Sequence, residues 1–117
     1  MFSQFFPADE QPHKEQEGVS SRILAYSPEL MLMEWRFENA GQVIPPHAHY
    51  HAQLSYVAKG AATIRLCDGS EKLCVAGDAV SFAPNESHGV VTAEPDTVIM
   101  DVFNPVRLDH LANHTQG

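Results

Sequence analysis

Residues 41–60 read GQVIPPHAHYHAQLSYVAKG, and they contain three of the seven histidines of the chain. Two consecutive prolines precede the histidines, and a run rich in β-branched and aromatic residues follows them, so a helix is disfavoured on both sides. In a strand, side chains two residues apart point to the same face, so His47 and His49 can present both imidazoles to one point in space. The stretch therefore predicts a chelating histidine pair without a helix.

Distance limits which other side chains can join this pair. Fully extended, residues 47–53 would span about 20 Å, which is too far for every polar side chain in the stretch to reach one ion. If the chain reverses at residues 50–52, Gln53 returns alongside His49 and three ligands form an arc. A fourth ligand has to come from elsewhere. The candidate is His88, which follows a polar turn and opens an apolar strand.

The rest of the chain has the pattern of short strands separated by turns. No long amphipathic helix is indicated, and eight or nine short strands predict an all-β sandwich or barrel. One face of the segment 30–38 is expected to be core, and it carries Met31, Met33, Trp35 and Phe37. Outside residues 41–60 the expected strands are 21–26, 30–38, 61–67, 72–75, 79–83, 88–93 and 97–103, followed by at most a short helix near 108–113.

Both ends of the chain differ from the strand-rich middle. We expect an arm at residues 1–20, a barrel at 21–106 and a tail at 107–117. The arm is polar apart from three phenylalanines, which need somewhere to pack. We therefore expect a homodimer in which they dock on the second subunit. In the tail, His110 and His114 have no acidic third ligand nearby, so they are expected to be exposed.

The Asp-Gly pair at residues 68–69 is the strongest short hairpin signal in the chain. A two-residue turn there would place Ile64 opposite Leu73, with both side chains on one face. In that register Cys67 and Cys74 are not opposite each other, so a disulfide is not expected. The two cysteines are also too poorly spaced for a metal site. We expect free structural thiols.

Composition narrows the class of partner. The chain has 117 residues, of which 44% are hydrophobic and 19% charged, and its formal net charge is −8. These values suit one globular domain with its own core. The negative charge argues against binding to nucleic acid or an anionic membrane, because both require a basic surface. No apolar run approaches the length of a membrane span, and the first residues do not form a secretory signal, so we expect a cytoplasmic protein with a small-molecule partner.

The histidine stretch resembles the first motif of the cupin superfamily, G(X)5HXH(X)3,4E(X)6G. Gly41, His47, His49 and Gly60 match it, with Gln53 where glutamate is usual. The second motif, G(X)5PXG(X)2H(X)3N, is matched only at Gly77 and His88, since Ala83, Asn85 and Thr92 replace its other residues. The resemblance implies a small RmlC-like jelly-roll barrel. It also implies one divalent ion, from among Ni, Mn, Fe, Zn and Co, with His47, His49, Gln53 and His88 as ligands.

A closer resemblance extends over most of the chain. The segments GVSSRILAYSPELM, HAHYHAQLSYVAKG and DVFNPVRLDHL are similar to the small cupins of pectin and uronate degradation, which linearise 4,5-unsaturated uronates. In that family a glutamine completes the metal site. The family implies further functional roles for Asp101, Phe103 and Arg107. The sequence departs from the pattern at Ala52, where relatives usually carry glutamate.

The residues support such a site on chemical grounds. Three imidazoles and an amide leave the charge of a divalent ion uncompensated, so an anionic ligand is expected. Arg107 could hold a substrate carboxylate through a bidentate pair. Asp101 lies in an apolar run, where a carboxylate is costly unless it is paired or functional, and it is the candidate general acid and base. Phe103 and His51 are candidate substrate contacts beside Arg107.

Simpler interpretations remain open for these residues. Asp101 and Arg107 could form a structural ion pair, and Gln53 could orient a ligand histidine without binding the ion. His51 could be a turn residue, and Phe103 could be core. For the whole protein, the alternatives are a ligand-binding or sensor cupin, a metal-dependent dioxygenase and a structural barrel without metal.

Overall fold

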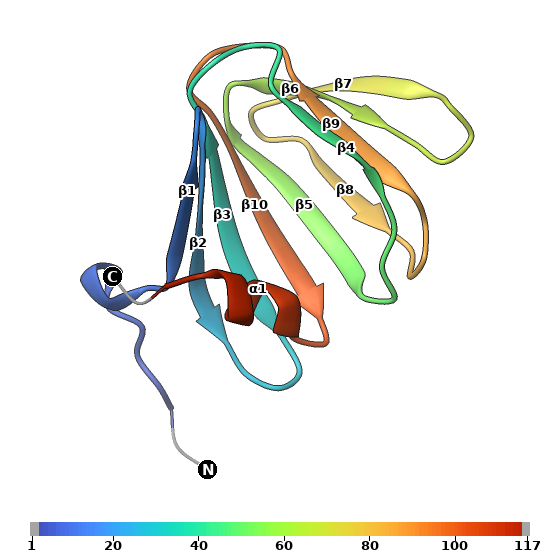
Figure 1. The fold of residues 1–117 in the computed structure, drawn as a ribbon. Helices are drawn as coiled ribbons and strands as arrows, with labels where there is room; N and C mark the ends of the chain where they lie inside the picture. The colour runs from blue at the N-terminus through green and yellow to red at the C-terminus, as the bar shows by residue number, and fades with distance from the viewer. Residues whose placement is uncertain (1–2, 116–117) are drawn as a thin grey trace.

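The computed structural model describes residues 3–115, which fold into two antiparallel sheets packed face to face (Figure 1). One sheet has six strands in the order β1-β2-β3-β10-β5-β8, and the other has four in the order β4-β9-β6-β7. The all-β prediction is therefore confirmed. The elements are a 3-10 helix at Ala8–Glu10, β1 (His13–Gln16), β2 (Val19–Tyr26), β3 (Met31–Phe37), β4 (Val43–His47), β5 (Ala52–Lys59), β6 (Ala61–Arg65), β7 (Glu71–Val75), β8 (Ala79–Phe82), β9 (His88–Thr92), β10 (Thr97–Asn104) and α1 (Leu108–Asn113).

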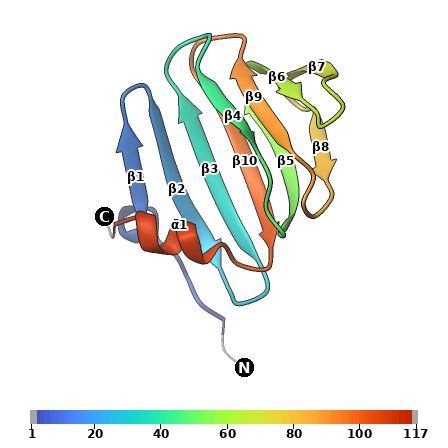
Figure 2. The ribbon, with the colours of Figure 1, turned by 45° about the vertical axis from the view of Figure 1, so that its right-hand side comes forward.

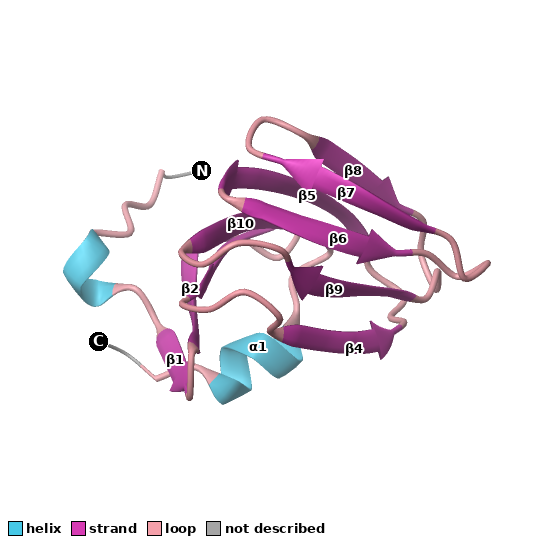
Figure 3. Cartoon of the chain, turned by 90° about the horizontal axis from the view of Figure 1, so that it is seen from above, coloured by secondary structure: helices cyan, strands magenta, loops and turns pink. Residues whose placement is uncertain are grey.

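Alternating side chains build the core between the sheets. On β3, Met31, Met33 and Phe37 are buried, as the period-2 pattern predicted, whereas Trp35 on the same face is only partly buried. Phe103 from β10 packs with the two methionines, while Phe37 packs with Ile99 nearer the other end of the same strand. The view from above shows these inner faces enclosed between the six-stranded and the four-stranded sheet (Figure 3). Any polar side chain on the inner face of either sheet therefore points into the same space as the apolar core.

The short helix α1 lies across one end of the six-stranded sheet (Figure 2). Leu111 of this helix and Val106 before it pack against the cluster of Ile23, Met31, Met33 and Phe103. The helix spans the residues at which a short helix was predicted. It closes one end of the space between the sheets. No helix among residues 3–115 is long and apolar enough to cross a membrane.

The predicted register of the β6–β7 hairpin is wrong by one residue. Thr63, not Ile64, lies opposite Leu73, and the connection is a three-residue loop in which Gly69 has a φ of 84°. The Leu66 N–H donates to the Ser70 carbonyl at 2.8 Å, closing this loop. A one-residue slip reverses the face of every side chain, so Leu73 is 55% exposed while Ile64 is buried. The expectation of two free cysteines is confirmed.

The polar arm is more ordered than its composition suggested. Residues 13–16 form β1, which pairs with β2, and His13 also bridges to Thr115 near the other end of the chain. Of the three phenylalanines, Phe6 packs on the Tyr26 ring at 5.4 Å and Phe5 is 90% exposed. Phe2 lies outside the described residues. Docking of the arm on a second subunit stays a prediction.

Candidate metal centre and its cavity

Three histidines meet at one edge of the barrel. His47 ends β4 and lies opposite His88, which begins β9, while His49 lies in the connection from β4 to β5. The ligand atoms of the three rings all lie within 4.8 Å of one another. The predicted reversal after the first two histidines does occur, since β5 begins at Ala52 and runs back along the barrel. The three histidines are thus placed as a group that could hold a metal ion.

Backbone carbonyls determine which nitrogen of each ring faces this point. Nδ1 lies 3.1 Å from the Pro45 oxygen in His47, 3.1 Å from the His51 oxygen in His49, and 2.9 Å from the Glu86 oxygen in His88. A carbonyl can only accept, so each Nδ1 carries a proton, and in a neutral ring Nε2 then keeps its lone pair. Burial lowers the pKa of both His49 and His88. These two rings are therefore neutral at physiological pH and could act as ligands.

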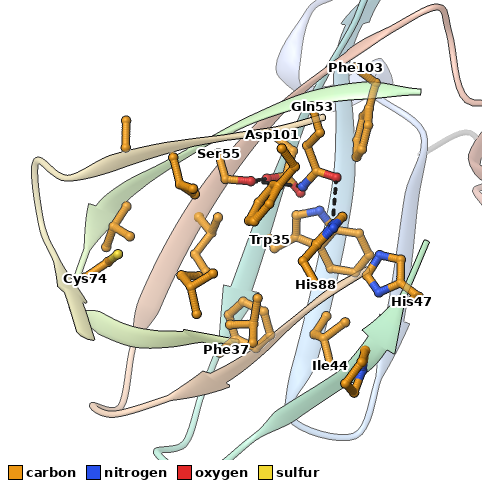
Figure 4. A pocket seen from close by; sticks show the side chains of 18 of the residues that line it. Trp35, Phe37, Ile44, His47, Gln53, Ser55, Cys74, His88, Asp101 and Phe103 are labelled. Atoms are coloured by element: carbon orange, nitrogen blue, oxygen red, sulfur yellow. Dashed lines mark hydrogen bonds between the residues drawn. The ribbon is translucent and has the colours of Figure 1, made fainter. Parts of the chain in front are cut away.

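Gln53 on β5 completes the group. Its Oε1 lies 2.9 Å from Nε2 of His49. The same oxygen lies 3.1 Å from Nε2 of His88 (Figure 4). All three atoms are acceptors when the rings are neutral, so no proton is available to link them. A cation placed among them would satisfy all three lone pairs. The residues thus fit a divalent ion, and the structure brings together all four predicted ligands.

A hydrogen-bonded chain runs from Gln53 to Asp101. The Gln53 Nε2–H donates to Ser55 Oγ at 2.9 Å, and the Ser55 hydroxyl donates to Asp101 Oδ1 at 2.6 Å. Gln53 and Ser55 share a face because they are two residues apart on β5, and Ser55 lies opposite Asp101 on β10. Figure 4 shows the three side chains in line above His88. Sequence reasoning missed Ser55, although the alternation from Gln53 along β5 was a signal for it.

Asp101 is a buried carboxyl without a charged partner in residues 3–115. Burial raises its pKa from 3.8 to about 6, against the opposing effects of the Ser55 and Gln53 hydrogen bonds. The nearby Trp35 indole also favours the ionised form, but its buried Nε1–H has no hydrogen-bond partner of good geometry. A carboxyl with a pKa near 6 can both accept and return a proton at neutral pH.

The suggestion that Asp101 and Arg107 form an ion pair is wrong, because Arg107 pairs with another carboxylate. The Arg107 guanidinium pairs with Asp109, with Nε and Nη2 donating to the two carboxylate oxygens at 3.0 and 2.7 Å. These hydrogen bonds and the Arg107 charge hold the pKa of Asp109 well below its usual range. The guanidinium carbon also lies 5.0 Å from the centre of the Phe103 ring. Arg107 is buried, and its orientation is fixed by Asp109 on one side and by the Phe103 ring on the other.

A cavity of about 360 Å³ lies between the sheets beside these groups. It has a mostly apolar wall to which Phe103 contributes. His51, the other predicted substrate contact, is not on this wall, and neither is His49. His51 is buried, stacks on Tyr50 at 4.0 Å, and its ring nitrogens have no hydrogen-bond partner of good geometry. The polar lining includes His47, Gln53, His88, Asp101, Arg107 and His110.

The expectation that His110 and His114 are exposed is wrong. His110 lines the cavity, with its ring 5.8 Å from Trp35 and 5.9 Å from Phe103. Burial and the charge of Arg107 lower its pKa to about 4, so it is neutral at physiological pH. His114 is buried, and its Nε2 lies 2.8 Å from Ser21 Oγ. The sequence did not indicate this packing because it depends on where α1 returns to the sheet.

Comparison with known proteins identifies the family to which the chain belongs. The family model described as a cupin domain matches residues 33–103. A curated relative, the pectin degradation protein KdgF of Dickeya dadantii (strain 3937), is 36% identical over 109 residues, which is 92% of this chain and 97% of that protein.

Two of the solved structures that match nearly the whole chain are also similar to it in length. KdgF from Halomonas sp. superimposes with a TM-score of 0.83 and 34% identity, covering 92% of this chain and 98% of that one. An RmlC-like cupin from Shewanella frigidimarina superimposes with a TM-score of 0.81 and 29% identity, covering 92% of this chain and 96% of that one. The protein therefore belongs to the cupin family and, within it, is similar to KdgF over most of its length.

Proposed function

We propose that this cupin is an enzyme that opens the ring of 4,5-unsaturated uronate monosaccharides, small sugar acids, and converts them to linear keto acids. The observation that carries the proposal is the meeting of three histidines that could hold a metal ion, a glutamine oxygen beside them, a buried carboxyl and a paired guanidinium around one cavity. The similarity to proteins named for pectin degradation supports this substrate class. Pectin is a polymer of uronates, so its breakdown supplies sugar acids.

The proposed ligands of the ion are His47, His49, Gln53 and His88. When bound, a divalent ion would supply undiminished positive charge that polarises a substrate oxygen and favours an anionic ligand, because all four donors are neutral. Arg107 would hold the substrate carboxylate through the N–H groups that Asp109 leaves free. The apolar wall, including Phe103, would exclude water from the reacting bonds.

The reaction is an internal redistribution of bonds and protons. The hemiacetal hydroxyl at C1 loses its proton, the bond between C1 and the ring oxygen breaks, and the ring oxygen becomes an enol oxygen. A proton then reaches C4 as the enol becomes a ketone, so no atom is gained or lost. Asp101 would carry this proton on Oδ2, because Oδ1 already accepts the Ser55 hydroxyl. Its pKa of about 6 suits both halves of the transfer.

The test mixes metal-loaded protein with unsaturated galacturonate and follows loss of the ultraviolet absorbance of its conjugated double bond. Asp101→Asn should lower the rate by roughly 10²-fold or more, as expected for loss of a general acid and base, while the metal stays bound. Asp96→Asn makes the same change of charge at an exposed position and should have no effect. No acceleration over buffer by the wild-type protein, or full activity of Asp101→Asn, would contradict the proposal.

The same sample separates this function from its alternatives. A dioxygenase would consume oxygen during turnover, whereas ring opening consumes none. A sensor or binding cupin would bind the uronate without loss of absorbance. Measuring dissolved oxygen and absorbance together therefore distinguishes the three.

A further inference from the structure

We infer that Ser55 is a positioning residue that sets the orientation of the Gln53 carboxamide, so that Oε1 rather than Nε2 faces the histidines. The inference rests on the proposed metal centre. It assigns a role to a residue that does not itself reach the ion. Ser55 is buried on β5 and hydrogen bonded on both sides, to Gln53 and to Asp101.

The direction of each hydrogen bond follows from counting protons. The serine hydroxyl has one proton, and Asp101 Oδ1 is an acceptor whether or not Oδ2 is protonated. The short 2.6 Å contact therefore uses the serine proton. The serine oxygen is left as an acceptor, and only the NH₂ group of Gln53 can donate to it. The amide oxygen must then face the other way.

Without this constraint, the opposite orientation of Gln53 would be favoured. A flipped amide would direct its NH₂ group at the Nε2 atoms of His49 and His88, which are 2.9 and 3.1 Å from the present oxygen. Both lone pairs would then be used in hydrogen bonds, and the amide would compete with an ion for the ligands. Ser55 opposes this flipped arrangement because its oxygen would face an amide oxygen that has no proton to donate.

The same hydroxyl joins the metal centre to the acid–base group. Gln53 contacts two histidine nitrogens, Ser55 contacts Gln53, and Asp101 contacts Ser55, all through side chains that face the interior. Ser55 and Asp101 are directly opposite in the β5–β10 register, which holds the last link in place. A change at Ser55 should therefore be detected at the metal centre.

The test measures the dissociation constant of Ni²⁺ by calorimetric titration of the metal-free full chain. Ser55→Ala should weaken binding about 10- to 100-fold, the usual effect of removing a group that orients a ligand. Ser55→Thr keeps the hydroxyl and should bind within a few-fold of wild type. Ser81→Ala on the outer face of the neighbouring strand β8 is the matched control and should have no effect. If Ser55→Ala does not fold, Ser55→Cys keeps the volume with a poor hydrogen-bonding group and should show the loss.

A double-mutant cycle distinguishes action through Gln53 from general loosening of the site. Ser55→Ala should cost nothing further in a Gln53→Ala background, because the group it orients is gone. Full additivity, or wild-type affinity in Ser55→Ala, would overturn the inference. His47→Ala tests the metal centre itself. If it loses affinity while Ser55→Ala does not, only the role of Ser55 is wrong. If it binds as wild type does, the proposed ligand set is wrong too.

Discussion

Replacing Asp101 by Asn should stabilise the metal-free protein at neutral pH while it lowers the proposed activity by roughly 10²-fold or more. In the folded state, burial raises the pKa of this carboxyl from 3.8 to about 6. At pH 7 the carboxyl is ionised in both folded and unfolded chains, so the difference corresponds to a cost of about 3 kcal/mol to the folded state. Asn has no charge to bury and can still accept the Ser55 hydroxyl through Oδ1.

The sign of the pH dependence follows from the raised pKa. Below about pH 4 the folded state holds Asp101 neutral and the unfolded chain is at most partly ionised, so wild type and variant should differ by no more than about 0.5 kcal/mol. As the pH rises through 6, the wild-type protein loses stability that the variant keeps. The gap should therefore open between pH 4 and 6 and approach about 3 kcal/mol above pH 7.

Urea unfolding of chelator-treated protein at pH 4 and pH 7.5 measures this gap. Asp96→Asn is the control, because Asp96 is exposed and asparagine tolerates its φ of 57°. It should change the free energy of unfolding by no more than about 0.5 kcal/mol at either pH. An Asp101→Asn variant that is no more stable than wild type at pH 7.5, or a gap of the same size at both pH values, would refute the reasoning.

Other changes test the motif glycines and the arginine. Gly60→Ala should lower the free energy of unfolding by about 3 kcal/mol, because its φ is +78° and a Cβ would lie 2.9 Å from the backbone Cα of Thr97. Gly41 has the same φ, but a Cβ there would meet no atom within 4 Å, so denaturant titration of Gly41→Ala should show a loss of only about 1 kcal/mol in the free energy of unfolding. Equal losses in the two glycine variants would exclude the steric explanation. Arg107→Lys cannot keep the bidentate pair with Asp109, because lysine has a single ammonium group. Steady-state kinetics should show a KM for the uronate raised roughly 10-fold, while the Ni²⁺ dissociation constant stays unchanged. An unchanged KM would argue against carboxylate binding by Arg107.

The candidate metal-binding group was accessible from the sequence because most of its geometry is local. His47 and His49 are two residues apart, and a reversal between two prolines and an alternating strand returns Gln53 to them. Only His88 required a long-range placement, and its position after a polar turn and before an apolar strand made it the candidate, which the motif resemblance also implied. Most strands were accessible for a similar reason, since turn residues and alternation are read over a few positions. The predicted eight or nine fall short of the ten strands in residues 3–115 because β1 lies in the polar arm and depends on pairing with β2.

Features that depend on pairing between distant segments were not accessible in the same way. The β6–β7 register was wrong because an Asp-Gly pair also suits a three-residue loop closed by a glycine with positive φ. His110 was placed in solvent because nothing near it in the chain indicates that α1 packs over the end of the six-stranded sheet. Asp109 was not predicted as the partner of Arg107, although it is only two residues away, because proximity in sequence does not show which carboxylate a long side chain turns toward.

The link between the metal centre and Asp101 depends on an irregularity in the β5–β10 pairing. Val98 lies opposite Lys59, but Ile99 lies opposite Val57, so Ala58 has no partner and the register shifts by one residue. Without this bulge, Asp101 would be opposite Tyr56, whose side chain is exposed on the outer face. The bulge instead pairs Asp101 with Ser55 and Phe103 with Gln53, on the face that lines the cavity. The bulge thus brings the buried carboxyl to the ligand group, which the histidine motif alone does not do.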